Sequence, residues 1–301
     1  MVGLTQQIQK EQEIRAELRR MLWRHREGSA SLHNMMRGVV LDDWHWTCER
    51  WRALSLRYFT PLTESQCDEL VEETLATIKA EKLPAFDDNP GADFFGWRDA
   101  HRLDHDQHAA HFSARKMLWR SDIEQCMDSA WAVYENGDLH KAYNLGDNCD
   151  LFHQILQRVT PNMMILQTIE RFPTDDKMTH SLSIVFRLPT ETGYVMVLRW
   201  IQSPLLLSFM ESEGLRLTRN MYWQAMDVAQ RNARGECAAI KFTLAGSITS
   251  DDPSYAQRWL SEIMIKLVRS ETKVMDTPLL TLESSLEQDS GSTSDSQQAP
   301  T

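Results

Sequence analysis

The apolar residues of the chain recur with two different periods. From residue 163 onward they mostly alternate with polar residues, as on the two faces of a strand, which predicts strands at 163–172, 182–188, 194–200, 221–230 and 238–248. Turn-forming residues at 189–193 and 232–235 separate successive strands, so neighbours pair as antiparallel hairpins. Two further strands are expected within 94–117, and residues 150–160 fit a helix and a strand equally well.

After the last strand the period lengthens to that of a helix. Asp252 is suited to cap a helix, and Pro253 fits its first position, where no backbone N–H is needed. The apolar residues that follow form one broad stripe over 252–269: Ala256, Trp259, Leu260, Ile263, Met264, Leu267 and Val268. A long amphipathic helix is therefore predicted to close over the antiparallel sheet.

The first half of the chain is predicted to be mainly helical. A helix starts at Thr63 or Ser65 and ends before Pro84, and Ser121 caps another that continues to Ala132 and stops at residues 136–138. Residues 39–60 are rich in aromatic residues, and Trp44 and Trp51 are spaced to share a helix face. Such a helix either stacks nucleobases or docks on its own domain, and docking is favoured.

Residues 4–26 are expected to form a polar helix. Leu4, Ile8, Leu18 and Leu22 partly match a coiled-coil seam, but Glu11 and Arg15 interrupt it. The alternatives are a short dimerising or DNA-binding helix and a solvated helix, of which the second is favoured. At the other end, residues 273–301 are acidic and rich in serine, which predicts a disordered tail.

Composition narrows the class of protein. The 301 residues carry a formal net charge of -11, so bulk charge does not attract the molecule to nucleic acid or to anionic lipid. The five cysteines include no CxxC pair, the N-terminus is polar, and the apolar run at 204–210 is too short to span a bilayer. We expect an intracellular protein, cytoplasmic or nuclear, without a transmembrane segment.

The sequence lacks three common motifs of catalytic and nucleotide-binding sites. There is no GxSxG, GxxxxGK[ST] or GxGxxG motif. A group of histidines, His101, His105, His108 and His111, holds a metal only if this stretch is helical. On one strand, His108 faces away from the other three, and Gly96 with the aromatic residues favours a strand. No metal site and no cofactor are therefore predicted.

Several charged residues lie within the strand meander, notably Glu170, Arg171, Arg187 and Arg199. A buried charge needs a partner, so an inward Arg199 meets either a polar head group or Glu170. The alternative, that these arginines face solvent, is favoured because antiparallel sheets often have one wet face.

The order of these elements resembles a known family. Phe95-Gly96-Trp97, Ala130-Trp131, the stretch from Val197 to Ile201, and Trp259-Leu260 are similar to the START-like domain of the oomycete mating-specific proteins. The resemblance covers roughly residues 64–272. It implies an α+β helix-grip fold, in which a curved antiparallel sheet packs on a long C-terminal helix with a cavity for a hydrophobic molecule between them. Family members often carry a bZIP-like helix before this domain. Residues 4–26 stand there but lack its basic pattern, so nucleic-acid binding is not expected.

The sequence therefore predicts three parts: an N-terminal helical segment (1–60), a START-like domain (61–272) and the tail (273–301). The first hypothesis is a non-enzymatic module that binds a lipid or other hydrophobic ligand. The residues predicted to line its cavity are Trp259, Ile263, Leu267, Met196, Leu198, Arg199, Trp200 and Phe186.

Two alternatives remain. One is a regulatory or scaffold protein that self-associates or binds a protein partner through its N-terminal helices. The other is a metal-dependent enzyme that uses the histidine group.

Overall fold

A computed structural model describes residues 44–80, 93–94, 96–104, 108–119, 122–144, 149–172, 178–250, 255, 259–260, 263 and 265–269. The chain divides into two compact units, Met1–Arg57 and Tyr58–Thr301. A helix at 44–58 begins in the first unit. There the rings of Trp44 and Trp51 meet edge to face, with centroids 5.7 Å apart, which confirms that they share one helix face. The predicted helix at 4–26 and the tail at 273–301 lie outside the described residues.

The second unit combines helices with a large sheet. Its helices are α2 (Glu64–Ala80), α3 (Ile123–Glu135), α4 (Gly137–Asn144) and α5 (Pro204–Ser212). Its strands are β1 (Asp93–Phe94), β2 (Trp97–Asp104), β3 (Ala109–Trp119), β4 (Asp150–Thr160), β5 (Met163–Arg171), β6 (Thr179–Pro189), β7 (Gly193–Trp200), β8 (Arg216–Arg231) and β9 (Cys237–Ser250). A further helix, called the C-terminal helix below, is described at residues 255, 259–260, 263 and 265–269.

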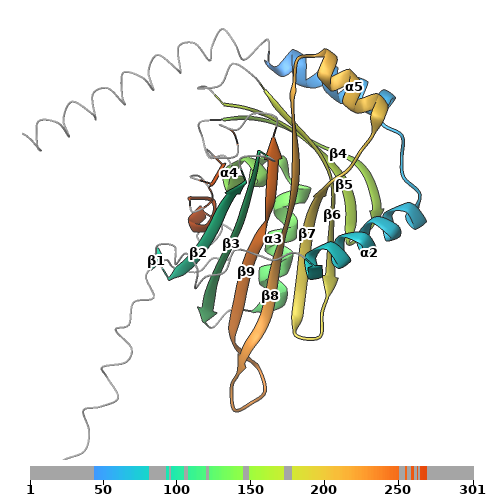
Figure 1. The fold of residues 1–301 in the computed structure, drawn as a ribbon. Helices are drawn as coiled ribbons and strands as arrows, with labels where there is room; N and C mark the ends of the chain where they lie inside the picture. Colours follow the sequence, from blue (N-terminus) through green and yellow to red (C-terminus); the bar gives the residue numbers. More distant parts are fainter. Residues whose placement is uncertain are drawn as a thin grey trace, which may run out of the picture. The chain divides into compact units, whose positions relative to one another are not determined.

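The nine strands form one curved sheet in the order β1-β2-β3-β9-β8-β7-β6-β5-β4 (Figure 1). Neighbours in this order pair antiparallel, as the hairpin signals predicted. A short parallel pairing of β6 with β8 is added at one end, where Thr179 lies opposite Arg216. In Figure 1, α2 crosses in front of the strands and α3 lies behind them.

Local sequence signals explain where two helices begin. At α2, the backbone N–H of Thr63 donates to the side chain of Gln66 (2.9 Å), and the backbone N–H of Gln66 donates back to the Thr63 hydroxyl (3.2 Å). This reciprocal capping box fixes the predicted start at Thr63. The cap predicted at Ser121 is wrong by one residue, because the Asp122 carboxylate accepts hydrogen bonds from the N–H groups of Glu124 and Gln125. A carboxylate there also complements the positive end of the helix dipole.

The structure resolves one ambiguity and adds two helices that the apolar pattern did not predict. Residues 150–160 are a strand, β4. The chain turns at Asn136 but resumes as α4, whose backbone begins with hydrogen bonds to the Asn136 side chain. The apolar run after Ser203 is α5, with Pro204 in its first turn.

The main core lies between one face of the sheet, α3 and the C-terminal helix. Its large members from the strands are Trp97, Phe112, Leu118, Met164, Leu166, Val185, Met196, Leu198, Met226, Ile240, Phe242, Leu244 and Ile248. The helices contribute Met127, Trp131, Tyr134, Tyr255, Ile263 and Leu267, with Trp259 and Leu260 packed against them. The sheet therefore grips the C-terminal helix, and the predicted α+β helix-grip class is confirmed. We call this side the inner face.

The opposite side, the outer face, is covered over β5, β6 and β7 by further helices. Strand alternation places Ile184, Phe186 and Val197 here, and all three are fully buried. Helix α2 buries Cys67, Val71 and Thr74, and α5 buries Leu206 and Met210. The sheet thus has a hydrophobic layer on each face.

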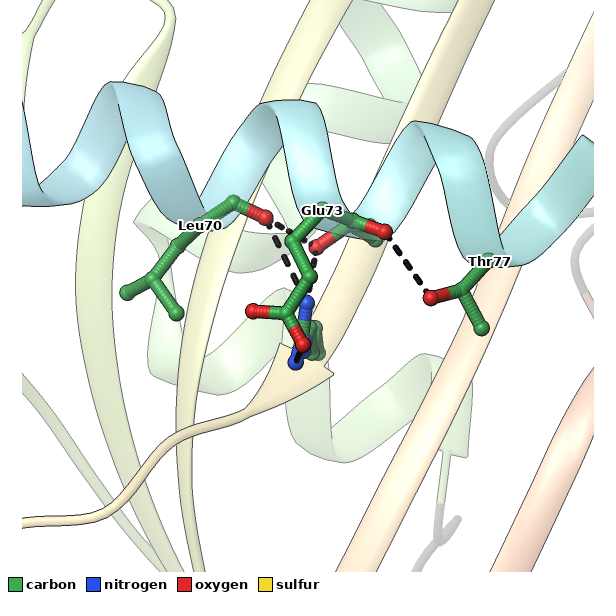
Figure 2. A network of polar contacts seen from close by, with 5 residues as sticks. Leu70, Glu73 and Thr77 are labelled. Carbon is green, nitrogen blue, oxygen red and sulfur yellow. Dashed lines mark hydrogen bonds and ion pairs between the residues drawn. The ribbon is translucent and has the colours of Figure 1, made fainter.

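A polar network fastens α2 to β7 (Figure 2). The Arg199 guanidinium donates to the Thr74 hydroxyl (2.8 Å), to the Glu73 carboxylate (2.8 Å) and to the carbonyl oxygen of Leu70 (3.4 Å). The Thr74 hydroxyl also donates to the Leu70 carbonyl. Arg199 therefore belongs to the outer face, and its carboxylate partner there is Glu73, not Glu170, which was considered only for an inward Arg199.

Candidate ligand cavity

A cavity lies between the inner face of the sheet, α4 and the C-terminal helix. The sheet side is formed by Leu166, Thr168, Glu170, Ser181, Ser183, Leu198, Asn220, Tyr222 and Leu244. The helix side is formed by His140, Tyr143, Tyr255, Trp259, Ile263 and Lys266. The volume open to the centres of water molecules is about 50 Å³. A buried water needs roughly 10–15 Å³ by that measure, so the cavity has room for a few waters.

One wall of the cavity is a row of hydroxyl groups. Thr168 on β5 lies directly opposite Ser181 on β6, and the hydroxyls of Ser181 and Ser183 are 3.1 Å apart. Thr168 and Ser183 are buried. Short polar side chains on a buried sheet face leave both space and unused hydrogen-bonding capacity. This wall is therefore suited to the polar end of a small molecule.

Asn220 adds an acceptor to the cavity lining. Its side-chain oxygen is buried and has no hydrogen-bond partner among the described residues. An amide oxygen without a partner destabilises a folded protein, because it has lost water and gained nothing in return. A bound molecule that donates a hydrogen bond to Asn220 removes that cost.

Aromatic and imidazole side chains close the end of the cavity near α3 and α4. The hydroxyls of Tyr134 and Tyr222 are 3.3 Å apart, and Gln224 donates to the Tyr143 hydroxyl at 3.3 Å. The rings of Tyr134 and His140 meet edge to face, with centroids 5.5 Å apart. The ring of His153 bonds the Tyr134 carbonyl at 3.0 Å. These contacts fix the tyrosine rings that border the cavity.

Burial keeps His140 and the two tyrosines at this end of the cavity uncharged. Loss of water around His140, together with the nearby charges of His153 and Lys266, lowers its pKa to about 3. Burial also raises the pKa of Tyr134 and of Tyr222 well above the ordinary value. At neutral pH the histidine is therefore a neutral imidazole and both tyrosines keep their protons.

Two charged residues remain in the lining, Lys266 on the C-terminal helix and Glu170 on β5. Lys266 is only 7% exposed, and its ammonium group lies 5.0 Å from the centroid of the Trp259 indole ring. A cation over an indole face is favourable, and more so away from water. The helix thus presents an aromatic ring and a cation to the cavity, opposite the hydroxyl wall.

Gly246 allows Tyr222 to border the cavity on the sheet side. It lies opposite Tyr222 across β8 and β9, with a φ of +152°. A side chain there would put its Cβ 2.2 Å from the Met221 carbonyl oxygen and 2.6 Å from the Tyr222 Cβ. Only glycine permits this close approach of the two backbones.

The structure brings some of the predicted cavity residues together and separates others. Leu198, Trp259 and Ile263 line the cavity. Met196 and Leu267 belong to the core around it.

The other three predicted residues have different surroundings. Phe186 and Arg199 lie on the outer face, because they alternate with Val185 and Leu198 along their strands. The Trp200 ring lies under the Arg219 guanidinium, 5.6 Å from its carbon to the ring centroid.

The histidine group is divided by the turn between β2 and β3. His101 lies opposite Phe112, whereas His111 lies opposite Arg102, so the two side chains are on different faces. The expectation that they face one way on a strand is wrong, since it treated two paired strands as one. His105 lies outside the described residues. Among those that are described, no three His, Cys, Asp or Glu side chains are placed to share a metal ion.

Several lining residues were not predicted from the sequence. His140 and Tyr143 lie on α4, whose brief apolar pattern after Asn136 gave little signal. The hydroxyl wall was visible as Ser181 and Ser183 alternating with apolar residues, but the alternation alone does not say which set faces a cavity. Glu170 was singled out as a charge within a strand, and it does line the cavity.

Comparisons with known proteins find solved structures of similar fold but no matching family. No protein-family model matches the chain. No curated protein matches it either. Human StAR-related lipid transfer protein 5 is 12% identical, with 70% of this chain and 96% of that chain covered and a TM-score of 0.48. Human STARD10 is 13% identical over 62% and 73% of the two chains, with a TM-score of 0.44.

An enzyme is also among the similar folds. The aromatase/cyclase Zhui from Streptomyces sp. R1128 is 10% identical over 56% of this chain and 93% of that one, with a TM-score of 0.34. At such identities and TM-scores these likenesses say nothing about what the present cavity holds. Within the described part of the chain, no helix is both long and apolar enough to cross a bilayer.

Proposed function

We propose that this protein is a non-enzymatic binding module for a lipid or other hydrophobic molecule with a polar end. The cavity between the sheet and the C-terminal helix carries the proposal. Leu166, Leu198, Leu244 and Ile263 supply apolar lining, and the hydroxyl wall with Asn220 supplies hydrogen bonds. A largely apolar site with a few placed polar groups is the usual form of a small-molecule pocket.

The size of the cavity sets a condition on binding. Ligand pockets usually enclose roughly 300–1,000 Å³, well above the room for a few waters found here. Side chains of the C-terminal helix must therefore move outward when the ligand enters. Trp259 is the first candidate, because it is only half-buried and borders the cavity.

Identification of a bound molecule tests this function. The full chain is purified from a eukaryotic host, weighed by native mass spectrometry, and extracted with solvent to identify what it carried. We expect one hydrophobic molecule with a polar group per chain. A chain that carries nothing and also takes up no fluorescent lipid from a panel contradicts the proposal.

A matched pair of variants on one helix locates the site. Ile263 lines the cavity and is 5% exposed, whereas Ile265 is 50% exposed. Ile263→Arg places a charge in the cavity and is expected to abolish uptake, while Ile265→Arg leaves uptake unchanged. Unchanged uptake by a folded Ile263→Arg protein would rule out this cavity as the binding site.

A second candidate function is contact with another protein through residues 1–60. The observation that favours it is the helix at 44–58, with its paired Trp44 and Trp51 and a Trp46 side chain that is 64% exposed. Deletion of residues 1–57 tests it. If neither oligomeric state nor partner binding changes, this candidate is lost.

A further inference from the structure

We propose that the end of the sheet around Trp119 binds the surface of an anionic lipid bilayer. The site consists of Arg98, Arg115, Met117, Trp119 and Lys241, which we call the Trp119 patch. It is separate from the cavity, and the proposal does not depend on what the cavity holds.

Strand register places the patch on one face. Arg98 on β2 lies opposite Arg115 on β3, and Met117 lies opposite Lys241 on β9. Met117 and Trp119 are separated by Leu118, which is 1% exposed and packs in the inner core. Because side chains alternate along a strand, all five residues project from the outer face, away from the core. Neighbouring strands are about 4.8 Å apart, so the five positions form one compact group.

The apolar members of the patch are unusually exposed. Trp119 is 60% exposed and Met117 is 38% exposed. Both lie on a strand that pairs along its whole length with β9, so a rigid sheet presents them. An indole ring is amphipathic and prefers the boundary between water and the acyl chains of a bilayer. Exposed apolar residues surrounded by polar ones mark interaction sites more often than isolated ones do.

Cationic residues outnumber acidic ones by one around these two residues, whereas acidic residues predominate in the chain as a whole. This end of the sheet and the adjoining β8–β9 turn carry six cationic residues: Arg98, Arg115, Lys116, Arg231, Arg234 and Lys241. The acidic residues at this end are five: Asp93, Asp122, Glu191, Asp227 and Glu236, of which Asp93 lies opposite Arg98 and Asp227 lies opposite Lys241. Asp227 accepts a hydrogen bond from Thr192, and Glu236 accepts one from Asn232. The net charge of -11 therefore lies mainly elsewhere.

Local rather than total charge decides contact with a membrane. At physiological ionic strength the Debye length is about 8 Å, so acidic groups on distant parts of the surface are largely screened. Cationic side chains near an anionic leaflet are each attracted to it. A bilayer also offers an acyl boundary for Trp119 and Met117, which a nucleic-acid backbone does not.

Vesicle sedimentation with the full chain tests the proposal. The probes are vesicles of phosphatidylcholine alone and of phosphatidylcholine with phosphatidylserine. We expect binding to the anionic vesicles only, and weaker binding as salt is raised. Lys241→Glu, which exchanges a cation for an anion, should lower the affinity about tenfold or more, and Trp119→Ala about tenfold.

Arg158→Glu is the matched control. Arg158 is an exposed cation on β4, at the opposite edge of the sheet, so its reversal makes the same change in net charge. It should leave vesicle binding unchanged. Equal binding to neutral vesicles, no binding to either kind, an equal loss in Arg158→Glu, or tighter binding to duplex DNA than to anionic vesicles would each overturn the proposal.

Loss of membrane binding by the Trp119 patch can be told apart from loss of ligand binding in the cavity. Vesicle binding is measured with the cavity intact, and the Trp119 variants change exposed side chains only. A protein that carries a ligand but ignores anionic vesicles retains the proposed function and loses the Trp119 patch.

Discussion

The two faces of the central sheet are built from alternate residues of the same strands but have opposite characters. On β6 and β7 the outer face presents Ile184, Phe186 and Val197, all fully buried beneath helices. The inner face presents Ser181, Ser183 and Leu198, which border a cavity. The outer face is therefore a packed layer that holds the fold. The inner face, which elsewhere carries the main core, leaves room at these positions for another molecule.

The largest difference between the faces is expected in the cost of removing a side chain. Phe186→Ala empties space in the packed layer and should lower the free energy of unfolding by about 3–5 kcal/mol. Leu198→Ala should lower it by about 2 kcal/mol, the low end for such a change, because it enlarges space that already exists. Urea unfolding of both variants measures this. Equal losses would mean that the inner face is packed as tightly as the outer one.

A buried histidine on each face of the sheet should make the folded protein less stable in acid. Burial lowers the pKa of His140 on the inner side and of His180 in the sheet to about 3. Between that value and the unfolded pKa of about 6.5 the unfolded chain binds more protons, so stability is complete above pH 6.5 and falls as the pH drops. Each histidine contributes a slope of about 1.4 kcal/mol per pH unit in this window.

Single substitutions check the assignment of this slope. His140→Gln and His180→Gln should each reduce the pH dependence of the unfolding free energy by about one histidine's share, measured between pH 4 and 6. The same slope in a variant and the natural protein would show that the histidine concerned is not buried as a neutral group.

A smaller effect is expected where the outer face is polar. Arg199→Met removes the guanidinium that binds Glu73 and Thr74. Because Arg199 is partly exposed, the loss should be about 1–2 kcal/mol. Glu73→Gln, which changes an exposed partner, should cost under about 1 kcal/mol. If Arg199→Met instead altered ligand uptake at unchanged stability, Arg199 would have to belong to the cavity.

The smallest change in stability should come from the hydroxyl wall. Ser181→Ala removes one half-buried hydroxyl and is expected to shift the unfolding free energy by no more than about 0.5 kcal/mol. Its effect on ligand retention should be larger than its effect on stability. A thermal melt together with native mass spectrometry separates the two.

Much of the fold was predictable because its signals are local. The helix start at Thr63, the hairpin turns and the stripe from Trp259 to Leu267 each depend on neighbours in sequence, and each prediction was confirmed in the structure. Helices α4 and α5 were missed because both are short. Pro204 and Leu205–Leu207 also resemble a buried strand as much as a helix start.

The cavity was less predictable because it depends on which strand face turns inward. Residues 163–169 are buried on both faces, so their pattern carries no direction. On the next two strands, Phe186 and Arg199 were predicted to line the cavity together with Leu198, which lies on the opposite face. The direction is set by helices far away in sequence, since α2 and α5 cover one face while α3 and the C-terminal helix cover the other. The histidine group shows the same limit, because a turn within it reversed the alternation.

Occupancy of the cavity tests the account most directly, through two bulky substitutions on one strand. Leu198→Trp fills the cavity, while Val195→Trp introduces the same large side chain on the outer face, where Val195 is only half-buried. Native mass spectrometry of both full-length variants, each with a thermal melt near that of the natural protein, gives the answer. We predict that the bound molecule is lost from Leu198→Trp and retained by Val195→Trp. Retention by a folded Leu198→Trp protein, or loss from both, would contradict a binding site between the sheet and the C-terminal helix.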